Sequence, residues 1–342
     1  MVSKNTPLRW GILGFGGFSD VAMAPAIAHT PGHRLAAIWG RDPQRTQAYA
    51  QKYEGARSAP SAEALMQSKD LDAVYIAAPN FQHADLTERA AERGLHVLCE
   101  KPMATSLEEA GRMIEACRRN GVRLAIGNMM RFNPCHAWIR DFITGGGLGE
   151  VTEAQGKFGY DLPAFFPLAT SPWRLESRLS GGGALMDVGV HTIDLLRWLL
   201  GQEVGEVSAL IDTRTHPFPI DWSSAAVLRF NGGAIASVSS SFDNRFRDND
   251  LTISGTLGSL HAVGTLWRQS RGGVRAVTER GIFTFEPATA TPDPYVLQIE
   301  DFAACVSAGR DPLVSGEEGL RDLEVCLGAY EAARTGTAIR LR

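Results

Sequence analysis

The chain has 342 residues, of which 44% are hydrophobic and 21% charged, and its formal net charge is −4. This length favours two domains, and this composition is typical of a water-soluble globular protein. The mildly acidic charge argues against nucleic acid or an anionic membrane as a partner, and no apolar stretch approaches the roughly 20 residues that span a bilayer.

The first third of the chain alternates short apolar runs with helical patterns. Ser106 and Glu109 form a capping box that predicts the start of one of these helices. We expect strands at 8–13, 35–39, 73–76, 96–99 and 123–126, with helices ending near 28, 53, 93 and 120. Strands separated by helices of this length predict a doubly wound parallel sheet of the Rossmann type.

The pattern changes near residue 130. Helical patterns at 133–144, 184–200, 295–308 and 317–335 flank alternating segments at 204–213, 225–230, 234–242, 251–254 and 260–263. Asn231-Gly232-Gly233 is typical of a hairpin turn. We therefore predict a nucleotide-binding α/β domain over 1–130 and an α+β domain over 131–342 with a mainly antiparallel sheet.

The cysteines and the N-terminus bear on the compartment. The five cysteines are scattered, and none forms a Cys-x-x-Cys pair. This usage favours reduced, buried thiols. The first seven residues carry no apolar core of the signal-peptide kind, so we expect a cytoplasmic protein.

A glycine-rich turn follows the first predicted strand. In Gly11-Ile12-Leu13-Gly14-Phe15-Gly16-Gly17-Phe18-Ser19, Gly14 permits a tight turn and Gly16 permits close approach of a pyrophosphate. Ser19 replaces the third glycine or alanine of the dinucleotide fingerprint. We expect residues 14–18 to bind the cofactor, whereas a purely structural glycine turn is the alternative.

The end of the second predicted strand discriminates between NAD and NADP. NAD sites usually place an acidic residue there, but this chain has Gly40, followed by Arg41 and Arg45. Both arginines could contact a 2′-phosphate. We therefore expect NADP, with NAD as the alternative because Asp42 could still bind a ribose.

Lys101 follows a predicted strand and precedes Pro102. The chain has only five lysines, and lysine can take part in proton transfer where arginine cannot. The alternative is a plain surface turn. We interpret Lys101 as a catalytic residue.

Asp187 and His191 form a second candidate pair. They are four residues apart, so they share one helical face, where an aspartate can orient an imidazole for proton transfer. A structural pair is the alternative. A metal site is disfavoured because no further ligands follow at metal-binding spacing. Trp173 and Arg174, just upstream, could line a sugar or nicotinamide pocket or serve as a packing anchor.

These motifs together resemble the Gfo/Idh/MocA oxidoreductases. The glycine turn, Ala78-Pro79-Asn80 with His83, Glu100-Lys101-Pro102, Arg131-Phe132-Asn133-Pro134, Trp173-Arg174, Gly181-Gly182-Gly183 and Asp187-x-x-x-His191 occur in that family's order over essentially the whole chain. The stretch 173–200 is most similar to the 1,5-anhydrofructose reductases and related sugar and dihydrodiol dehydrogenases.

The resemblance implies a Rossmann domain followed by a domain with a large open sheet that forms a homodimer or homotetramer. It also implies a cis Lys101–Pro102 bond. Lys101, Asp187 and His191 would surround the nicotinamide and the reacting carbon. Further cofactor contacts are expected at Ala78, Pro79, Asn80, His83, Glu100, Lys101, Asn128, Trp173 and Arg174. Substrate contacts are expected at Lys101, Arg131, Tyr160, Trp173, Asp187 and His191. In the reductases a serine stands at the position of Gly40, which weakens the case for NADP.

The sequence therefore predicts an NAD(P)-dependent oxidoreductase acting on a sugar, polyol or diol, without metal. His191 would be the general acid/base, with Lys101 stabilising or sharing the charge on the same oxygen. The alternative is a non-catalytic sensor or regulator that keeps the nucleotide site. The aromatic residues Phe158, Tyr160, Phe165, Phe166 and Trp173 indicate a pocket with flat apolar walls, or else a dimer contact.

Overall fold

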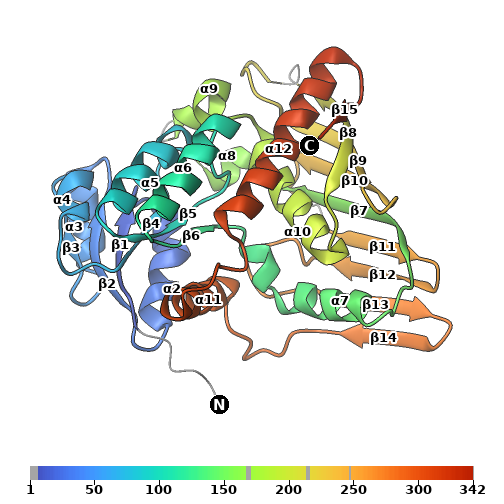
Figure 1. Cartoon of the computed structure of the whole chain (residues 1–342), viewed down its shortest axis with the longest axis horizontal. Helices are drawn as coiled ribbons and strands as arrows, with labels where there is room; N and C mark the ends of the chain where they lie inside the picture. The colour runs from blue at the N-terminus through green and yellow to red at the C-terminus, as the bar shows by residue number, and fades with distance from the viewer. Residues whose placement is uncertain (1–6, 167–170, 213–215, 246–247, 342) are drawn as a thin grey trace. The chain divides into compact units, whose positions relative to one another are not determined.

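A computed structural model describes residues 7–166, 171–212, 216–245 and 248–341 of the chain (Figure 1). The chain divides into two units, one formed by Met1–Gly127 with Tyr295–Leu320 and the other by Asn128–Pro294 with Arg321–Arg342. No helix of the described ranges is both long enough and apolar enough to cross a membrane.

The first unit is built on a six-stranded parallel sheet. Its order is β3 (Arg57–Ser58), β2 (Arg34–Trp39), β1 (Arg9–Leu13), β4 (Ala73–Ile76), β5 (His96–Cys99) and β6 (Leu124–Ile126). The central strands are buried on both faces, which explains their continuous apolar runs. The order reverses between β1 and β4, which is where such sheets bind ligands. The Rossmann prediction is confirmed.

Helices connect these strands. They are α1 (Gly17–Val21), α2 (Met23–His29), α3 (Pro43–Ala50), α4 (Ala62–Met66), η1 (Asn80–Gln82), α5 (His83–Glu92) and α6 (Leu107–Arg119). The Ser106 hydroxyl caps α6 by accepting a hydrogen bond from Glu109 N at 3.2 Å, as the capping box predicts. The Glu109 carboxylate, however, accepts from Thr105 N rather than completing the box at Ser106.

A segment from the C-terminal part of the chain returns to the first unit. In α11 (Pro294–Ala308), Phe302 packs on the fully buried Trp10 ring, with centroids 5.4 Å apart. Ile126 N donates to Val314 O at 2.9 Å, and Arg123 pairs with Asp311 at 2.8 Å. Residues 295–320 therefore belong with the first unit, which differs from the contiguous division expected from the sequence.

The second unit contains a nine-stranded mixed sheet. Its order is β14 (Gly281–Phe285), β13 (Gly273–Thr278), β12 (Gly258–Val263), β11 (Leu251–Gly255), β7 (Val151–Gly159), β10 (Ile235–Ser241), β9 (Ser223–Phe230), β8 (Val204–Asp212) and β15 (Ile339–Arg340). All neighbouring pairs are antiparallel except β7 with β10. The predicted mainly antiparallel sheet is confirmed, and Asn231-Gly232-Gly233 joins β9 to β10.

The second unit also contains helices. They are η2 (Met129–Phe132), α7 (Pro134–Thr144), α8 (Leu162–Phe165), η4 (Pro172–Leu175), α9 (Ser177–Ser180), η5 (Leu185–Gly189), α10 (Val190–Leu200) and, from residue 321 on, α12 (Gly316–Thr335). α10 packs on β7 and α7 on β13, as Figure 1 shows. Side chains alternate in burial along β9, so the opposite face of the sheet is exposed.

The five cysteines are all buried and free, in agreement with the sequence. Burial raises the pKa of Cys117 and of Cys135 to about 12, so these thiols stay protonated at neutral pH.

Candidate active site

The glycine turn lies between β1 and α1 at the point where the strand order reverses. Gly14 has φ +86°, and a Cβ there would lie 2.4 Å from Ala78 N, so only glycine fits. Gly14 N and Phe15 N both donate to Trp39 O, at 2.9 and 2.7 Å. A Cβ at Gly17, in contrast, would meet nothing within 4 Å. Hydrogen bonds to Trp39 O thus fix the turn, and the space beside Gly17 is open. This arrangement fits the pyrophosphate of a dinucleotide.

The two phenylalanines of the turn pack within the first unit. Phe15 is buried and its ring lies 5.0 Å from that of Tyr49. The Phe18 ring lies 6.2 Å from that of Tyr295. Their side chains therefore brace the turn.

Gly40, at the end of β2, cannot be replaced by a larger residue. A Cβ there would lie 2.6 Å from Phe15 O and 2.8 Å from Thr46 Oγ1. Asp42 caps α3 by accepting from Arg45 N at 3.1 Å, so its carboxylate has a structural task. Arg41 and Arg45 are exposed, and Arg45 Nη2 donates to Tyr49 Oη at 3.1 Å. The end of β2 is therefore followed by two exposed arginines and by an aspartate that caps α3.

His83 joins the turns that follow β4 and β5. Its Nδ1 lies 2.9 Å from Pro102 O, and its Nε2 lies 2.9 Å from Ala78 O. The ring is fully buried, and burial lowers the pKa of His83. A neutral ring donates to one carbonyl at a time. His83 was expected among the cofactor contacts; its ring contacts the main chain at Ala78, just before Pro79-Asn80, and at Pro102.

Glu100, Lys101 and Pro102 follow β5. Tyr75 Oη donates to Glu100 Oε1, and Lys101 N donates to Glu100 Oε2 at 3.2 Å. Burial, and then the charge of Glu100, raises the pKa of Tyr75 well above its ordinary value, so the phenol remains a donor. Lys101–Pro102 is cis, as the family resemblance implied. Glu100 is thus fixed from two sides and in turn fixes the main chain at Lys101.

A buried polar network occupies the start of the second unit. Asn128 Nδ2 donates to Asp322 Oδ2 at 2.9 Å, Arg197 pairs with the same carboxylate at 2.6 Å, and Arg131 pairs with Asp194 at 2.6 Å. Burial, and then the neighbouring Asp194, raises the pKa of Asp322 well above its ordinary value. The network ties η2 to α10, which carries His191. Asn128 and Arg131, predicted at the cofactor and the substrate, both belong to this network.

Asp187 and His191 lie one turn apart where the π-helix η5 meets α10. Tyr160 Oη donates to Asp187 Oδ2 at 2.5 Å, and Arg174 Nη1 lies 3.8 Å from Asp187 Oδ1. Burial, and then the charge of Asp187, raises the pKa of Tyr160 well above its ordinary value. The Arg174 guanidinium also lies over the Phe166 and Trp173 rings, at 4.1 and 4.6 Å. Tyr160 and Arg174 therefore hold Asp187, a contact that the sequence pattern did not reveal.

Asp221 positions the start of this helical segment and was missed from the sequence. Its carboxylate accepts from Gly183 N at 2.6 Å, from Leu185 N at 2.7 Å and from Tyr330 Oη at 2.6 Å. A Cβ at Gly183 would lie 1.9 Å from Asp221 O, which explains the glycine run before Asp187. Only the adjacent Trp222 marks this aspartate in the sequence, and that signal is weak.

Aromatic rings connect His191 to Asp187. Phe158 lies 6.1 Å from the His191 ring and 6.1 Å from Trp267, measured between centroids. Trp267 lies 5.5 Å from Phe165, which lies 5.2 Å from Tyr160. Phe158, Phe165 and Tyr160 thus belong to one chain of ring contacts that also includes Trp267, from the connection between β12 and β13.

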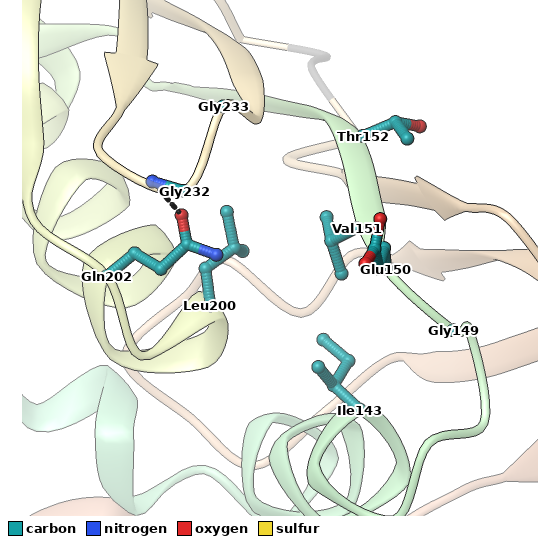
Figure 2. Close-up of a pocket in the computed structure, with 9 residues that line it drawn as sticks. All are labelled: Ile143, Gly149, Glu150, Val151, Thr152, Leu200, Gln202, Gly232 and Gly233. Carbon is teal, nitrogen blue, oxygen red and sulfur yellow. Dashed lines mark hydrogen bonds between the residues drawn. The ribbon is translucent and has the colours of Figure 1, made fainter.

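No group of three His, Cys, Asp or Glu side chains within the described ranges is arranged to hold a metal. Figure 2 shows a hollow at the far end of the β9–β10 hairpin, where Gln202 accepts a hydrogen bond from Gly232 N at 3.0 Å. It is lined by none of the predicted site residues but by Ile143, Gly149, Glu150, Val151, Thr152, Leu200, Gln202, Gly232 and Gly233.

Comparisons with known proteins agree with this geometry. Residues 8–128 match a family described as "Oxidoreductase family, NAD-binding Rossmann fold", and residues 136–261 match the "GFO/IDH/MocA C-terminal domain". D-xylose 1-dehydrogenase (NADP(+)) 2 of Haloferax volcanii is 33% identical, over 98% of this chain and 100% of the relative. The 1,5-anhydro-D-fructose reductase of Ensifer adhaerens is 30% identical, over 97% of this chain and 98% of the relative.

A solved structure is similar over the same span. The aldose-aldose oxidoreductase from Caulobacter crescentus, complexed with glycerol, superposes with a TM-score of 0.89 at 31% identity, over 98% of this chain and 100% of that one.

Proposed function

Because the chain belongs to the Gfo/Idh/MocA family of NAD(P)-dependent oxidoreductases, we propose that it interconverts a hydroxyl and a carbonyl group on a sugar, polyol or related compound. The observation that carries this proposal is the fixed Asp187 one turn before His191, held by Tyr160 and Arg174 beside a chain of aromatic rings. Such an arrangement suits a hydroxylated substrate whose proton must be removed.

The chemistry divides between residues of the chain. Oxidation removes a hydride from the carbinol carbon and a proton from its hydroxyl, and a C=O bond forms. When bound, the nicotinamide supplies the acceptor of that hydride. His191 accepts the hydroxyl proton, Lys101 donates a hydrogen bond to the same oxygen, and Asp187 orients neighbouring hydroxyls.

The substrate class follows from the relatives. Those named above act on D-xylose, 1,5-anhydro-D-fructose and aldoses according to their names, which supports a sugar here. A panel of aldoses, polyols and diols, assayed for reduction of NADP and NAD, tests the proposal. Turnover of at least one sugar is expected; turnover of none would contradict it.

NADP is the proposed cofactor because Arg41 and Arg45 stand where NAD enzymes usually place an acid, and Gly40 leaves no room for one. Replacing both arginines with alanine should weaken NADP binding by about 10–100-fold, since charge-assisted hydrogen bonds to the 2′-phosphate are lost. Binding of NAD should change by less than about 3-fold. Fluorescence titration of both dinucleotides measures this without turnover.

Arg119→Ala is the matched control, because Arg119 is an exposed arginine of the first unit at the end of α6. It should leave both affinities unchanged. Tighter binding of NAD than of NADP by the unmodified protein would overturn the cofactor assignment.

A homodimer or homotetramer through the exposed face of the nine-stranded sheet is also proposed. Leu210 and Val227 on this face are 80% and 50% exposed, and Ile235 and Val277 are 43% and 39% exposed. An open sheet with apolar side chains on its outer face favours burial against a second copy. Sedimentation equilibrium should give a dimer or tetramer, and Leu210→Asp with Val227→Asp should shift it towards monomer. A monomeric unmodified protein would refute the proposal.

A further inference from the structure

The connection between β12 and β13, residues 264–272, is held at both ends. Leu266 N donates to Asn249 O at 3.1 Å, and Asn133 Nδ2 donates to Thr265 O at 3.3 Å. Gly272 has φ +82°, and a Cβ there would lie 2.2 Å from Val263 O, so the chain closes tightly. The side chains between these anchors therefore project from a fixed main chain.

Arg271 contacts one of the aromatic rings of the candidate active site. Its guanidinium carbon lies 4.8 Å from the centre of the Trp267 ring, and Trp267 is separated from His191 only by Phe158. Stacking on a ring engages the flat face of a guanidinium and leaves its N–H donors in the plane available. The N–H donors of Arg271 are thus linked to His191, the proposed acid/base, through the rings of Trp267 and Phe158.

The charge of Arg271 is not balanced by a neighbour. It forms no salt bridge within the described ranges, and every Asp and Glu of the sequence lies in those ranges. Partial burial lowers the pKa of Arg271, although the group remains fully charged at neutral pH. Residues 251–278 contain Arg268, Arg271 and Arg275 but no Asp or Glu, in a chain whose net charge is −4. Arg271 is therefore an exposed cation in contact with an aromatic ring of the candidate active site.

We propose that Arg271 binds an anionic group of the substrate, a carboxylate or a phosphate, so that sugar acids or sugar phosphates are preferred to neutral sugars. The group would be carried on the part of the substrate distant from the reacting carbon, because Trp267 and Phe158 separate Arg271 from His191. A planar guanidinium recognises both anions bidentately. The substrate preference rests on the proposed oxidoreductase activity, whereas anion binding at Arg271 does not.

Steady-state kinetics test the preference with glucose, glucuronate and a glucose phosphate. Replacing Arg271 with glutamine should lower kcat/KM for the preferred anionic sugar by about 10–100-fold, mainly through KM, and for glucose by less than about 3-fold. Arg271→Lys should recover part of the loss, because it keeps the charge and loses the bidentate geometry. Glucuronate and the phosphate are separate arms that show which anion is recognised.

Arg280→Gln is the matched control. Arg280 lies in the exposed turn beyond the other end of β13 and, within the described ranges, also forms no salt bridge. This variant should leave kcat and KM unchanged for glucose and for both anionic sugars. Equal losses for glucose and the anionic sugars in Arg271→Gln, or equal effects of Arg280→Gln, would overturn the proposal.

A binding measurement separates this proposal from the activity itself. Titration of the intact protein with glucuronate and with inorganic phosphate, at constant ionic strength set by chloride, should change tryptophan fluorescence in the unmodified protein and not in Arg271→Gln. If no sugar is turned over but this Arg271-dependent binding persists, the oxidoreductase proposal fails and the anion site stands. If sugars are turned over and neither anion binds through Arg271, the anion site is refuted.

Discussion

Replacing Lys101 with alanine should lower kcat by about 10²–10⁴-fold, the range that positioned proton donors and acceptors usually contribute. The loss is expected because the oxygen of the reacting carbon would lose the cation that stabilises its developing charge. The Kd for NADP should change little, since the glycine turn and the end of β2 are untouched. Stopped-flow measurement of turnover and fluorescence titration of the cofactor give the two quantities.

Two further variants sharpen this test. Lys101→Arg should remain impaired, because a guanidinium keeps the charge but neither fits the same space nor releases a proton at neutral pH. Lys69→Ala removes a lysine from an exposed loop of the same unit and should be fully active. Near-normal turnover by Lys101→Ala would remove the residue from the mechanism.

The second large effect is expected at His191. Replacement by alanine should lower kcat/KM by about 10²–10⁴-fold, because the group proposed to accept the hydroxyl proton is removed. Raising the pH should restore part of the rate, since solvent base can then take the proton. A pH–rate profile of the variant against the unmodified enzyme measures both the loss and the recovery.

His29→Ala is the control, since His29 is exposed near the end of α2 in the first unit. If His191→Ala is impaired while Lys101→Ala is not, His191 alone handles the proton; the opposite result assigns it to Lys101. Activity retained in both variants would contradict the mechanism and favour a binding protein without chemistry.

The fold could be predicted where each element carried its own signal. The buried strands β1, β4 and β5 are continuous apolar runs, and Ser106 marks the start of α6. β14 was missed because its residues are exposed on both faces, so no alternation marks it. The return of α11 to the first unit was missed because it depends on packing between Trp10 and Phe302, which are nearly the whole chain apart.

In the candidate site, too, residues in local motifs could be predicted, and residues that depend on distant partners could not. Gly14, Lys101 and the Asp187–His191 pair stand in local motifs, so their neighbours in the sequence reveal them. Asp221 supports Leu185 N from 36 residues away, and a distant aspartate gives no local signal. The network of Asn128, Arg131 and Asp322 likewise depends on partners in separate elements, which only a folded chain brings together.

Transfer of a labelled hydrogen tests most directly whether this protein moves a hydride from a sugar carbon to the nicotinamide. A sugar that the enzyme turns over is prepared with deuterium on the carbon that is oxidised, and the reduced nicotinamide is examined by mass spectrometry. The account predicts that the deuterium is recovered in the reduced cofactor. Deuterium released to solvent, or retained in the product, would contradict direct hydride transfer by this protein.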